Sequence, residues 1–445
     1  MKYAVILAAG LGTRMKTDVP KCSVAILKKP MVNYIVGELE KSNVDEIITI
    51  VGHKKEVIMD LLKDKVKYAH QKELLGTAHA IRSAVEYIKE DGITLILPGD
   101  TPLVDKGIIE GMINKHYEEN NGITIGTLIV DEPFGLGRII RDSGKKILRI
   151  AEEFQATPEE KLVKEINTCM FVINNDLLLK YLPLINNDNS KGEYTITDIV
   201  ELIAKDKHKV GTFTIEEEYK MAGINDLHQL SKVERAFRKA INKKHMINGV
   251  NIINPDTVTI GPDVVIEHGV TIYPGTCIFG DCKIDNGAII GPNTELNNVI
   301  VGANTKVVHS MVSDATIKAD SFIGPFTYIR DGVVIGENTR VGAFVEVKNS
   351  TVGDNTFASH LAYIGDAKVG NNVNFGCGCI TANFDGVNKH KTVIKDNAFV
   401  GCNSNLIAPV TVGENAFIAA GTTVTEDVKD EAFVIGRSKM IQKEK

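Results

Sequence analysis

The sequence lacks the features that mark membrane, secreted and nucleic-acid-binding proteins. No apolar run approaches the roughly 18 residues of a membrane-spanning helix, and the first residues lead straight into a strand-like segment without a signal peptide's apolar stretch and cleavage site. Acidic residues outnumber basic ones by 57 to 51, for a formal net charge of −6, which argues against a generally basic nucleic-acid binder. We therefore expect neither a membrane nor a nucleic acid as partner, and a local cationic pocket stays possible.

Cysteine shows no organised pattern. The seven cysteines are odd in number, contain no CxxC pair and have no metal-like spacing with histidines. Reduced thiols in a cytoplasmic protein are the simplest interpretation. With 445 residues, of which 43% are hydrophobic and 24% charged, the chain is globular and long enough for two or three domains.

The first half alternates short apolar runs with amphipathic stretches. Strand-like runs cover Ala4–Leu7, Ile47–Val51, Thr94–Leu97 and Ile123–Ile129, and helical patterns cover Met31–Lys41 and Thr77–Lys89. This order of strands and helices predicts a parallel sheet with helices on both faces. Ligands of such sheets usually lie at the carboxyl ends of the strands.

From about Gly249 the pattern changes to a repeat of six residues. Aliphatic residues recur at every sixth position in three series, Ile260 to Leu296, Ile317 to Val347 and Ile394 to Val424. This period fits neither a helix nor a lone alternating strand, and it predicts a β-solenoid in which each hexapeptide supplies one short strand and one turn.

We expect domains at 1–226 and 248–445, joined by a helix over 227–247. A polar insertion, Ile380–Thr392, predicts a loop on one face, which is either a binding element or a neutral surface loop.

A glycine-rich segment, Ala8–Met15, directly follows the first predicted strand. Small residues there let backbone N–H groups approach a phosphate closely. Arg14 and Lys21 would neutralise the charge of a polyphosphate. The pattern is neither the Walker motif nor the dinucleotide motif. A glycine-rich turn alone can be purely structural, but the two cations favour a phosphate site.

The segment Leu7–Met15, with Pro20 and Lys21, resembles the signature of sugar-1-phosphate nucleotidyltransferases. Further motifs narrow the resemblance: Gln71, Leu75–Ala80, Gly99–Leu103, Gly135–Ile139, Glu165–Thr168, Gly192–Asp198 and Gly223–Asn225. Together with the solenoid, almost the whole chain resembles the bifunctional N-acetylglucosamine-1-phosphate uridylyltransferase/glucosamine-1-phosphate N-acetyltransferase family. The resemblance implies an N-terminal α/β nucleotidyltransferase domain with a Rossmann-like mixed sheet, a C-terminal left-handed parallel β-helix, and a homotrimer.

For the first domain, the resemblance implies uridylyl transfer from UTP to N-acetylglucosamine-1-phosphate with release of pyrophosphate. Arg14 and Lys21 would be catalytic, and Asp100 and Asn225 would bind Mg²⁺ through hard oxygen atoms. The positions that match substrate contacts are Leu7, Ala8, Gly10, Lys21, Gln71, Gly76, Thr77, Gly137, Glu152, Asn167 and Asn225. By themselves, Asp100 could serve a turn, Asn225 could cap a helix, and Glu153 could substitute for Glu152.

For the solenoid, spacing alone makes one prediction. Arg330 and Lys348 are 18 residues apart, so they stack on one face if a coil takes three hexapeptides, and stacked cations suit a phosphate. The resemblance implies acetyl transfer from acetyl-CoA to glucosamine-1-phosphate, with His360 as general base. It assigns glucosamine-1-phosphate to Arg330, Lys348, Tyr363 and Asn374, and acetyl-CoA to Cys377, Asn383, Phe384, Cys402, Ala420 and Arg437. Cys377, Cys402 and Phe384 replace the family's usual Ala, Ser and Tyr, and these changes could slow acetyl transfer.

Two other interpretations stay open on the sequence. One is a nucleotidyltransferase for another sugar-1-phosphate, with the solenoid as an oligomerisation or regulatory scaffold; the other is a regulatory pseudoenzyme. His360, together with Arg330 and Lys348, favours acetyl transfer over the scaffold. Intact Arg14, Lys21, Asp100 and Asn225 disfavour the pseudoenzyme.

Overall fold

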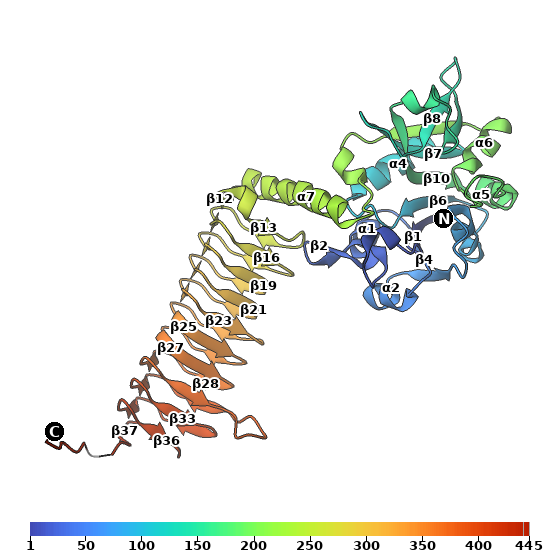
Figure 1. Cartoon of the computed structure of the whole chain (residues 1–445). Coiled ribbons are helices and arrows are strands. Elements are labelled where there is room, and N and C mark those ends of the chain that lie inside the picture. Colours follow the sequence, from blue (N-terminus) through green and yellow to red (C-terminus); the bar gives the residue numbers. More distant parts are fainter. Residues whose placement is uncertain (439, 445) are drawn as a thin grey trace. The chain divides into compact units, whose positions relative to one another are not determined.

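The chain forms two compact units, Met1–Phe237 and Arg238–Lys445. The computed structural model describes residues 1–438 and 440–444. Figure 1 shows a helix-covered sheet in the first unit and a stack of short strands in the second. Helix α7 (Leu227–Ile247), which contains neither Gly nor Pro, includes the boundary between the units.

The first unit contains a mixed nine-stranded sheet whose main order is β11-β7-β10-β6-β1-β4-β5. The strands are β1 (Lys2–Leu7), β4 (Glu46–Val51), β5 (Lys67–His70), β6 (Ile93–Pro98), β7 (Ile123–Ile129), β8 (Arg138–Arg141), β9 (Ile147–Ala151), β10 (Glu165–Asn174) and β11 (Val210–Thr214). β10 runs antiparallel to both β6 and β7. The four strands predicted from the pattern are parallel to one another, but the antiparallel β10, which the pattern did not single out, lies between β6 and β7. The sheet is therefore mixed and not purely parallel, and the mixed sheet implied by the resemblance is confirmed.

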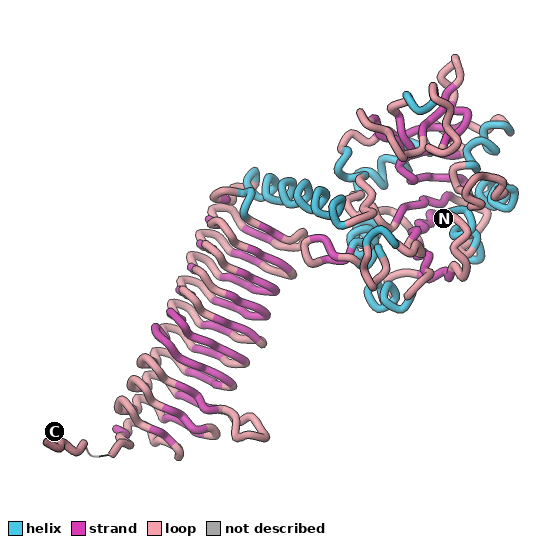
Figure 2. Tube along the Cα trace, viewed as in Figure 1, coloured by secondary structure: helices cyan, strands magenta, loops and turns pink. Residues whose placement is uncertain are grey.

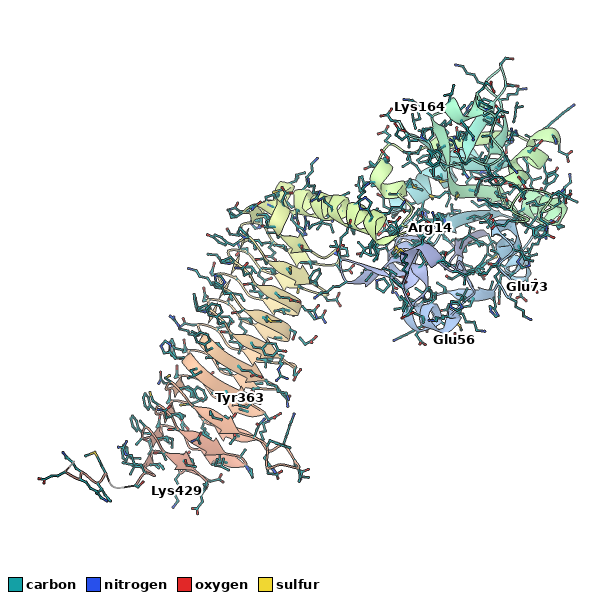
Figure 3. The ribbon with its side chains drawn as sticks, viewed as in Figure 1. Arg14, Glu56, Glu73, Lys164, Tyr363 and Lys429 are labelled. Carbon is teal, nitrogen blue, oxygen red and sulfur yellow. The ribbon has the colours of Figure 1, made fainter. Side chains whose placement is uncertain are left out.

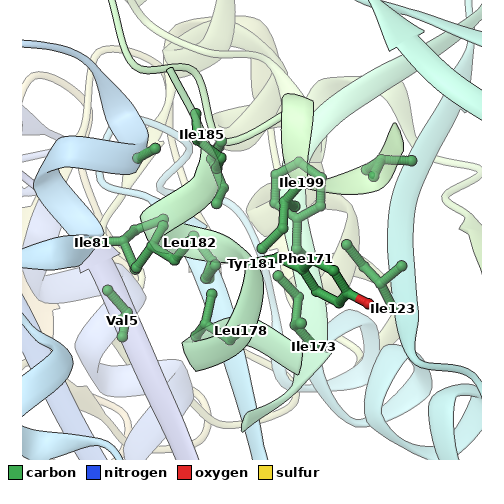
Figure 4. Close-up of a cluster of buried hydrophobic side chains, with 14 of the residues drawn as sticks. Val5, Ile81, Ile123, Phe171, Ile173, Leu178, Tyr181, Leu182, Ile185 and Ile199 are labelled. Atoms are coloured by element: carbon green, nitrogen blue, oxygen red, sulfur yellow. The ribbon is translucent and has the colours of Figure 1, made fainter. Parts of the chain in front are cut away.

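Both faces of this sheet are buried, as strand β1 shows. Tyr3 and Val5 belong to one apolar cluster, and Ala4 and Ile6 to the other, because successive side chains of a strand point to opposite faces. Helices α3 (Thr77–Arg82), α5 (Asn175–Tyr181) and α6 (Asp198–Lys205) cover the first cluster, and α1 (Met31–Glu40), α2 (Lys55–Leu62) and α4 (Lys106–Glu118) cover the second. Figure 4 shows part of the first cluster, packed around Phe171, Leu178 and Tyr181.

The helix predicted over Thr77–Lys89 is shorter than its pattern. It ends at Arg82, and Val85–Tyr87 forms a separate 3₁₀ turn. The break lets Val85 and Tyr87 pack against the core, where the Tyr87 hydroxyl donates to the Tyr68 carbonyl at 3.1 Å. Tertiary packing thus overrides a continuous helical pattern.

The second unit is a left-handed parallel β-helix that extends from β12 (Asn251–Ile252) to β37 (Phe433–Val434). Figure 2 shows its short strands stacked coil upon coil. Strands of successive coils pair in parallel register, so that Ile260 lies beside Ile278. The aliphatic residues of the repeat point inward and are buried, which confirms the predicted solenoid. The strands nearest the predicted site are β23 (Tyr328–Arg330), β25 (Arg340–Lys348), β27 (Phe357–Gly365), β29 (Asn374–Phe375), β30 (Ile380–Ala382), β32 (Phe399–Val400), β33 (Asn405–Ile407), β35 (Phe417–Ile418) and β36 (Thr423–Val424).

The turns explain the Gly-acidic-Asn motif that follows several repeats. Asn338 adopts a left-handed φ of 50°, which asparagine tolerates better than most residues. Its side chain donates to the Asn355 side chain of the next coil at 2.8 Å. A Cβ atom on Gly336 would stand 2.5 Å from the Asp354 backbone nitrogen, so that position requires glycine.

Candidate active sites

The first site lies at the carboxyl ends of β1 and β6, where Leu7 pairs with Pro98. The loops that follow these strands line a cavity of about 560 Å³. Nine of the residues predicted from the sequence line it: Leu7, Gly10, Arg14, Lys21, Gln71, Gly76, Thr77, Asp100 and Asn225. Figure 3 labels Arg14, whose side chain belongs to this cluster.

Charged and amide side chains converge in this cavity. The Lys21 Nζ donates to the Asp100 carboxylate and, at 2.8 Å, to Asn225 Oδ1. The Arg14 guanidinium donates to the same Asn225 oxygen at 2.8 Å. Asn225 does not cap α7 with its side chain, because Asp226 fills that role by accepting from the Gln229 amide at 2.8 Å. A carboxylate oxygen and an amide oxygen therefore face one cationic position.

Close backbone approaches build this cluster. Gly12 has a φ of 60°, and a Cβ atom on it would stand 2.6 Å from the Lys21 Cβ. At Gly99, a Cβ atom would stand 2.7 Å from the Leu7 carbonyl oxygen. The backbone amide of Ile224 donates to the Asp100 carbonyl at 3.1 Å and holds the two metal-ligand candidates on neighbouring segments.

The loop predicted to read uracil is clamped by a later segment of the chain. Gly76 has a φ of 109°, and a Cβ atom there would stand 2.5 Å from the Tyr194 carbonyl oxygen. The Thr77 hydroxyl accepts from the Ile196 amide at 2.9 Å. Gln71 is buried and donates to the Gly76 carbonyl at 3.2 Å. Only glycine fits at position 76, and the loop is held from both sides.

The structure separates the roles of two adjacent glutamates. The Glu152 carboxylate accepts from the Thr197 hydroxyl at 3.1 Å and lies about 3.4 Å from where a Cβ on Gly137 would stand. Glu153 instead pairs with the buried guanidinium of Arg138 at 2.5 Å. Neighbouring residues at a strand end point in opposite directions, so Glu152 is the one that faces Gly137.

Asn167 lies beside this group. Its backbone amide donates to the Gly137 carbonyl at 2.8 Å. Cys169, which sequence reasoning did not single out, follows at a bulge of β10 with a φ of 59° and lines the cavity. The side chain is accessible from the cavity, but desolvation by the surrounding walls raises the pKa of its thiol to about 12, and the charges of Glu152 and Asp100 add to that effect. The sequence carries no signal for Cys169, because its left-handed backbone conformation appears only in the structure.

The second site lies on the solenoid, where Arg330 and Lys348 are register partners in β23 and β25. The predicted stacking of these cations is therefore confirmed. Arg330 pairs with Glu346 at 2.7 Å and with Asp331 at 3.1 Å, and the Lys348 Nζ lies 3.9 Å from the same Asp331 carboxylate. Glu346 and Asp331 partly offset the positive charge of the stack.

Tyr363, labelled in Figure 3, lies in the next coil. Gly365 follows Lys348 in the ladder, and a Cβ on it would stand 2.4 Å from the Tyr363 hydroxyl oxygen. Asn383 directly follows β30 within the insertion; its side-chain amide lies 3.5 Å from that hydroxyl and also donates to the Asp366 carboxylate.

The insertion loop also carries a cation that sequence reasoning missed. Lys389 lies beside Lys348, and the interaction of the two like-charged amines lowers the pKa of Lys389. Asp385 holds the loop in shape by accepting from the amides of Val387 and Asn388 at 2.8 and 2.7 Å. The sequence feature that could have pointed to Lys389 is its place in the polar insertion, downstream of the repeats that carry Arg330 and Lys348.

His360 begins a ladder of four predicted residues along one corner of the solenoid. The register of the flanking strands advances by 17 residues to the next coil, which sets Cys377 opposite His360. It then advances by 25, which sets Cys402 opposite Cys377, and by 18, which sets Ala420 opposite Cys402. All four residues are exposed.

The other predicted residues flank this ladder. Arg437 donates from its guanidinium to the Ala420 carbonyl at 3.0 Å. Asn374 lies half-buried in β29, three positions before Cys377. Phe384 is 60% exposed on the insertion loop, where it bridges with Lys389.

Among the described residues, no helix is both long and apolar enough to cross a membrane, and no three His, Cys, Asp or Glu side chains gather as metal ligands would. Fold and sites together define a two-part transferase, a nucleotidyltransferase followed by a hexapeptide-repeat transferase. Family models agree: residues 3–232 match the nucleotidyl transferase family, and residues 314–349 and 391–426 match the bacterial transferase hexapeptide repeats.

Full-length relatives identify the combination. The chain is 50% identical over 443 residues to the Bifunctional protein GlmU of Acholeplasma laidlawii, with coverage of 99% of this chain and 96% of that protein. It is 46% identical over 440 residues to the protein of the same name from Thermoanaerobacter pseudethanolicus (99% and 96%) and 43% identical over 444 residues to that of Geobacillus sp. (100% and 97%). The chain belongs to the bifunctional GlmU family. The predicted resemblance is thereby confirmed, and with it the bifunctional enzyme of UDP-N-acetylglucosamine synthesis that combines a uridylyltransferase with a glucosamine-1-phosphate acetyltransferase.

Proposed function

We propose that the cavity at the end of β1 binds UTP and N-acetylglucosamine-1-phosphate and that Arg14 and Lys21 are its catalytic cations. The convergence of both side chains on Asn225 supports this proposal. In-line attack of a sugar phosphate on the α-phosphorus needs positioning and charge neutralisation more than covalent help. Arg14 binds phosphate oxygens through its planar fork and Lys21 as a point charge. Gly10, in the loop after β1, offers its backbone N–H to the triphosphate, and Leu7 and Ala8 are the neighbouring substrate contacts; the Ala8 N–H itself is taken by the Ile50 carbonyl at 3.0 Å.

Asp100 and Asn225 are the proposed Mg²⁺ ligands. Their oxygen atoms face the position of the Lys21 ammonium, which supports a cation site there. Two protein oxygens suit Mg²⁺, because this ion usually takes one or two protein ligands and completes its shell with water and substrate phosphates. When bound, Mg²⁺ offsets the charge that develops on the phosphates.

Two separate sets of residues bind the uracil base and the N-acetylglucosamine in this proposal. Gln71, Gly76 and Thr77 take the uracil, because buried polar groups left unpaired by another base are costly. Gly137, Glu152 and Asn167 take the N-acetylglucosamine. The contact of Glu152 with Thr197 beside Gly137 supports Glu152, not Glu153, in this role.

The solenoid corner is the proposed acetyltransferase site. Arg330, Lys348, Tyr363 and Asn374 bind glucosamine-1-phosphate, and the contact of Lys389 with Lys348 supports adding that third cation. His360 takes a proton from the sugar amine as the nitrogen attacks the acetyl-CoA thioester. The cofactor contacts are Cys377, Asn383, Phe384, Cys402, Ala420 and Arg437, four of which the ladder and the Arg437 hydrogen bond bring together.

A homotrimer is the proposed assembly, with acetyl transfer between solenoids. Phe326, Phe344 and Leu361 are 59%, 62% and 58% exposed, and all three have left-handed φ values. The two phenylalanine rings stack at 5.4 Å. Exposed, strained apolar residues in a row indicate a covered surface, and Leu361 adjoins His360. Phe344→Glu should therefore give monomers in light scattering and abolish thiol release, but spare pyrophosphate release. Trimers with that substitution would contradict this interface.

We further propose domain limits of 1–226, 227–247 and 248–445, and a cytoplasmic location, where UTP and acetyl-CoA are available.

One pair of variants tests both activities. Asp100→Ala should abolish pyrophosphate release from UTP and spare thiol release from acetyl-CoA; His360→Ala should do the reverse. Loss of both activities in either variant would refute two independent sites. If the unsubstituted enzyme, with its cysteines kept reduced, released no thiol from acetyl-CoA, the scaffold interpretation would be supported.

A further inference from the structure

Two exposed thiols occupy the same corner of consecutive solenoid coils. Cys377 and Cys402 both stand at the first position of a turn, and both are exposed. The Asn403 amide donates to the Cys377 carbonyl at 2.8 Å, and the strands on either side of the turn keep one register. The two cysteines therefore lie directly above one another.

This arrangement comes close to what a disulfide needs. Neighbouring parallel strands lie about 4.7–4.9 Å apart, within the roughly 4.4–6.8 Å between the Cα atoms of a disulfide. Their Cβ atoms, in equivalent turns, keep about the same separation, slightly more than the roughly 3.5–4.5 Å of a bonded pair. Closing the bond therefore draws the two coils together at the corner that carries His360.

A third thiol, Cys379, is a natural control. It is buried, and its Sγ donates to the Gly401 carbonyl at 3.1 Å. Burial raises the pKa of Cys379 to about 11, and the neighbouring Cys402 and Cys377 contribute to this rise. Because the thiolate is the reactive form, Cys379 stays inert beside the pair.

We propose that Cys377 and Cys402 form a reversible disulfide that switches off acetyl transfer without affecting uridylyl transfer. The effect on acetyl transfer rests on the proposed function of His360. The oxidant is a low-molecular-weight disulfide: one cysteine thiolate attacks it, forms a mixed disulfide and releases one thiolate. The second cysteine then attacks the protein sulfur, closes the Cys377–Cys402 bond and releases the other thiolate, so two thiols are oxidised and one disulfide is reduced. Strain in the bond makes it easily reduced, as a regulatory disulfide must be in a reducing compartment.

The test treats the full-length reduced enzyme with oxidised glutathione and maps disulfides by mass spectrometry of tryptic peptides. Trypsin cuts at Lys389 and Lys395, so the two cysteines fall on different peptides. We expect the cross-link in the natural protein and in Cys379→Ala, but not in Cys377→Ser or Cys402→Ser. Cys379→Ala also removes the ambiguity between Cys377 and Cys379, which share a peptide. Glutathione adducts without the cross-link would overturn the pairing.

Activity is the second measurement, with each variant compared with its own reduced form. Oxidation should lower thiol release from acetyl-CoA at least tenfold in the natural protein, dithiothreitol should restore it, and pyrophosphate release should not change. Cys377→Ser and Cys402→Ser should show equal rates before and after oxidation. A complete cross-link with unchanged acetyl transfer would overturn the switch. If the reduced enzyme releases no thiol, the proposed acetyltransferase site fails, while the peptide map still decides the pairing.

Discussion

The hydroxyl oxygen of Tyr363 occupies space that only glycine at position 365 leaves free, since a Cβ on Gly365 would stand 2.4 Å away. Gly365→Ala should push the Tyr363 ring from its place beside Lys348. Because a displacement of about 1 Å can cost on the order of a hundredfold in rate, we expect thiol release to fall tenfold or more and pyrophosphate release to stay the same. Gly37→Ala, whose new Cβ meets nothing within 4 Å, is the control. Full acetyl transfer by Gly365→Ala would show that Tyr363 does not position substrate.

Gly12→Ala tests the first cavity in the same way. The left-handed φ of 60° and the approach of 2.6 Å to the Lys21 Cβ oppose any side chain at this position. We expect pyrophosphate release to fall at least tenfold, with weaker UTP binding by calorimetry. Thiol release by the same chain is the internal control. Unchanged UTP affinity would mean that the loop does not hold the nucleotide.

Asp105 stabilises the first unit in two ways. Its side chain caps α4 by accepting from the Ile108 amide at 3.0 Å and pairs with Lys220 at 2.7 Å. Asp105→Ala should cost about 1 kcal/mol through the lost cap, whereas Asp105→Asn keeps the cap and loses the ion pair. Thermal unfolding of the first unit should therefore rank the natural protein above Asn and Asn above Ala. The reverse order of the two variants would contradict capping.

The same carboxyl makes a pH prediction. Burial tends to raise the pKa of Asp105, but the hydrogen bonds from Lys220 and the Ile108 amide outweigh it and hold the pKa below 3.8. A lowered folded pKa means that this stabilisation is present above pH 3.8 and is lost as the pH falls through the folded value. Asp105→Asn should remove that part of the acid sensitivity. A melting curve equally acid-sensitive with asparagine would refute it.

His116 should make the first unit less stable in mild acid. Its ring is buried between Thr124 and Asn174, with contacts of 3.0 and 2.9 Å. Burial lowers the pKa of His116 below 6.5, although Asn174 partly opposes the shift. The unfolded chain therefore binds the proton first, and stability falls as the pH drops below 6.5. We expect His116→Gln to flatten the change in melting temperature between pH 7 and 5; an unchanged slope would exclude His116 as its source.

The sequence predicted repeating structure better than direction or length. Four strands of the first unit and the whole aliphatic repeat were predicted because burial imposes a period on the chain. The antiparallel direction of β10 was not predicted from the pattern, because an apolar run has the same pattern in both directions. The helix after Thr77 was predicted too long because Val85 and Tyr87 turn to pack against the core.

At the sites, spacing predicted the stack of Arg330 and Lys348, whereas contacts across distant segments could not be read from it. The opposite orientations of Glu152 and Glu153 depend on Thr197 and Arg138, which lie far off in sequence. The role of Lys389 depends on how Asp385 folds the insertion back on the solenoid. Alignment of Cys377 with Cys402 depends on a register that crosses that insertion.

That register has a practical consequence. The insertion lengthens one coil step to 25 residues, yet β30 and β33 pair as closely as β33 and β36, where the step is 18. The extra segment therefore leaves the register of the coils unchanged. A peptide epitope or fluorophore tag inserted at Gly386 would lie on the outside of the solenoid and leave the register of the coils unchanged. This position would therefore allow the protein to be labelled close to its proposed acetyltransferase site.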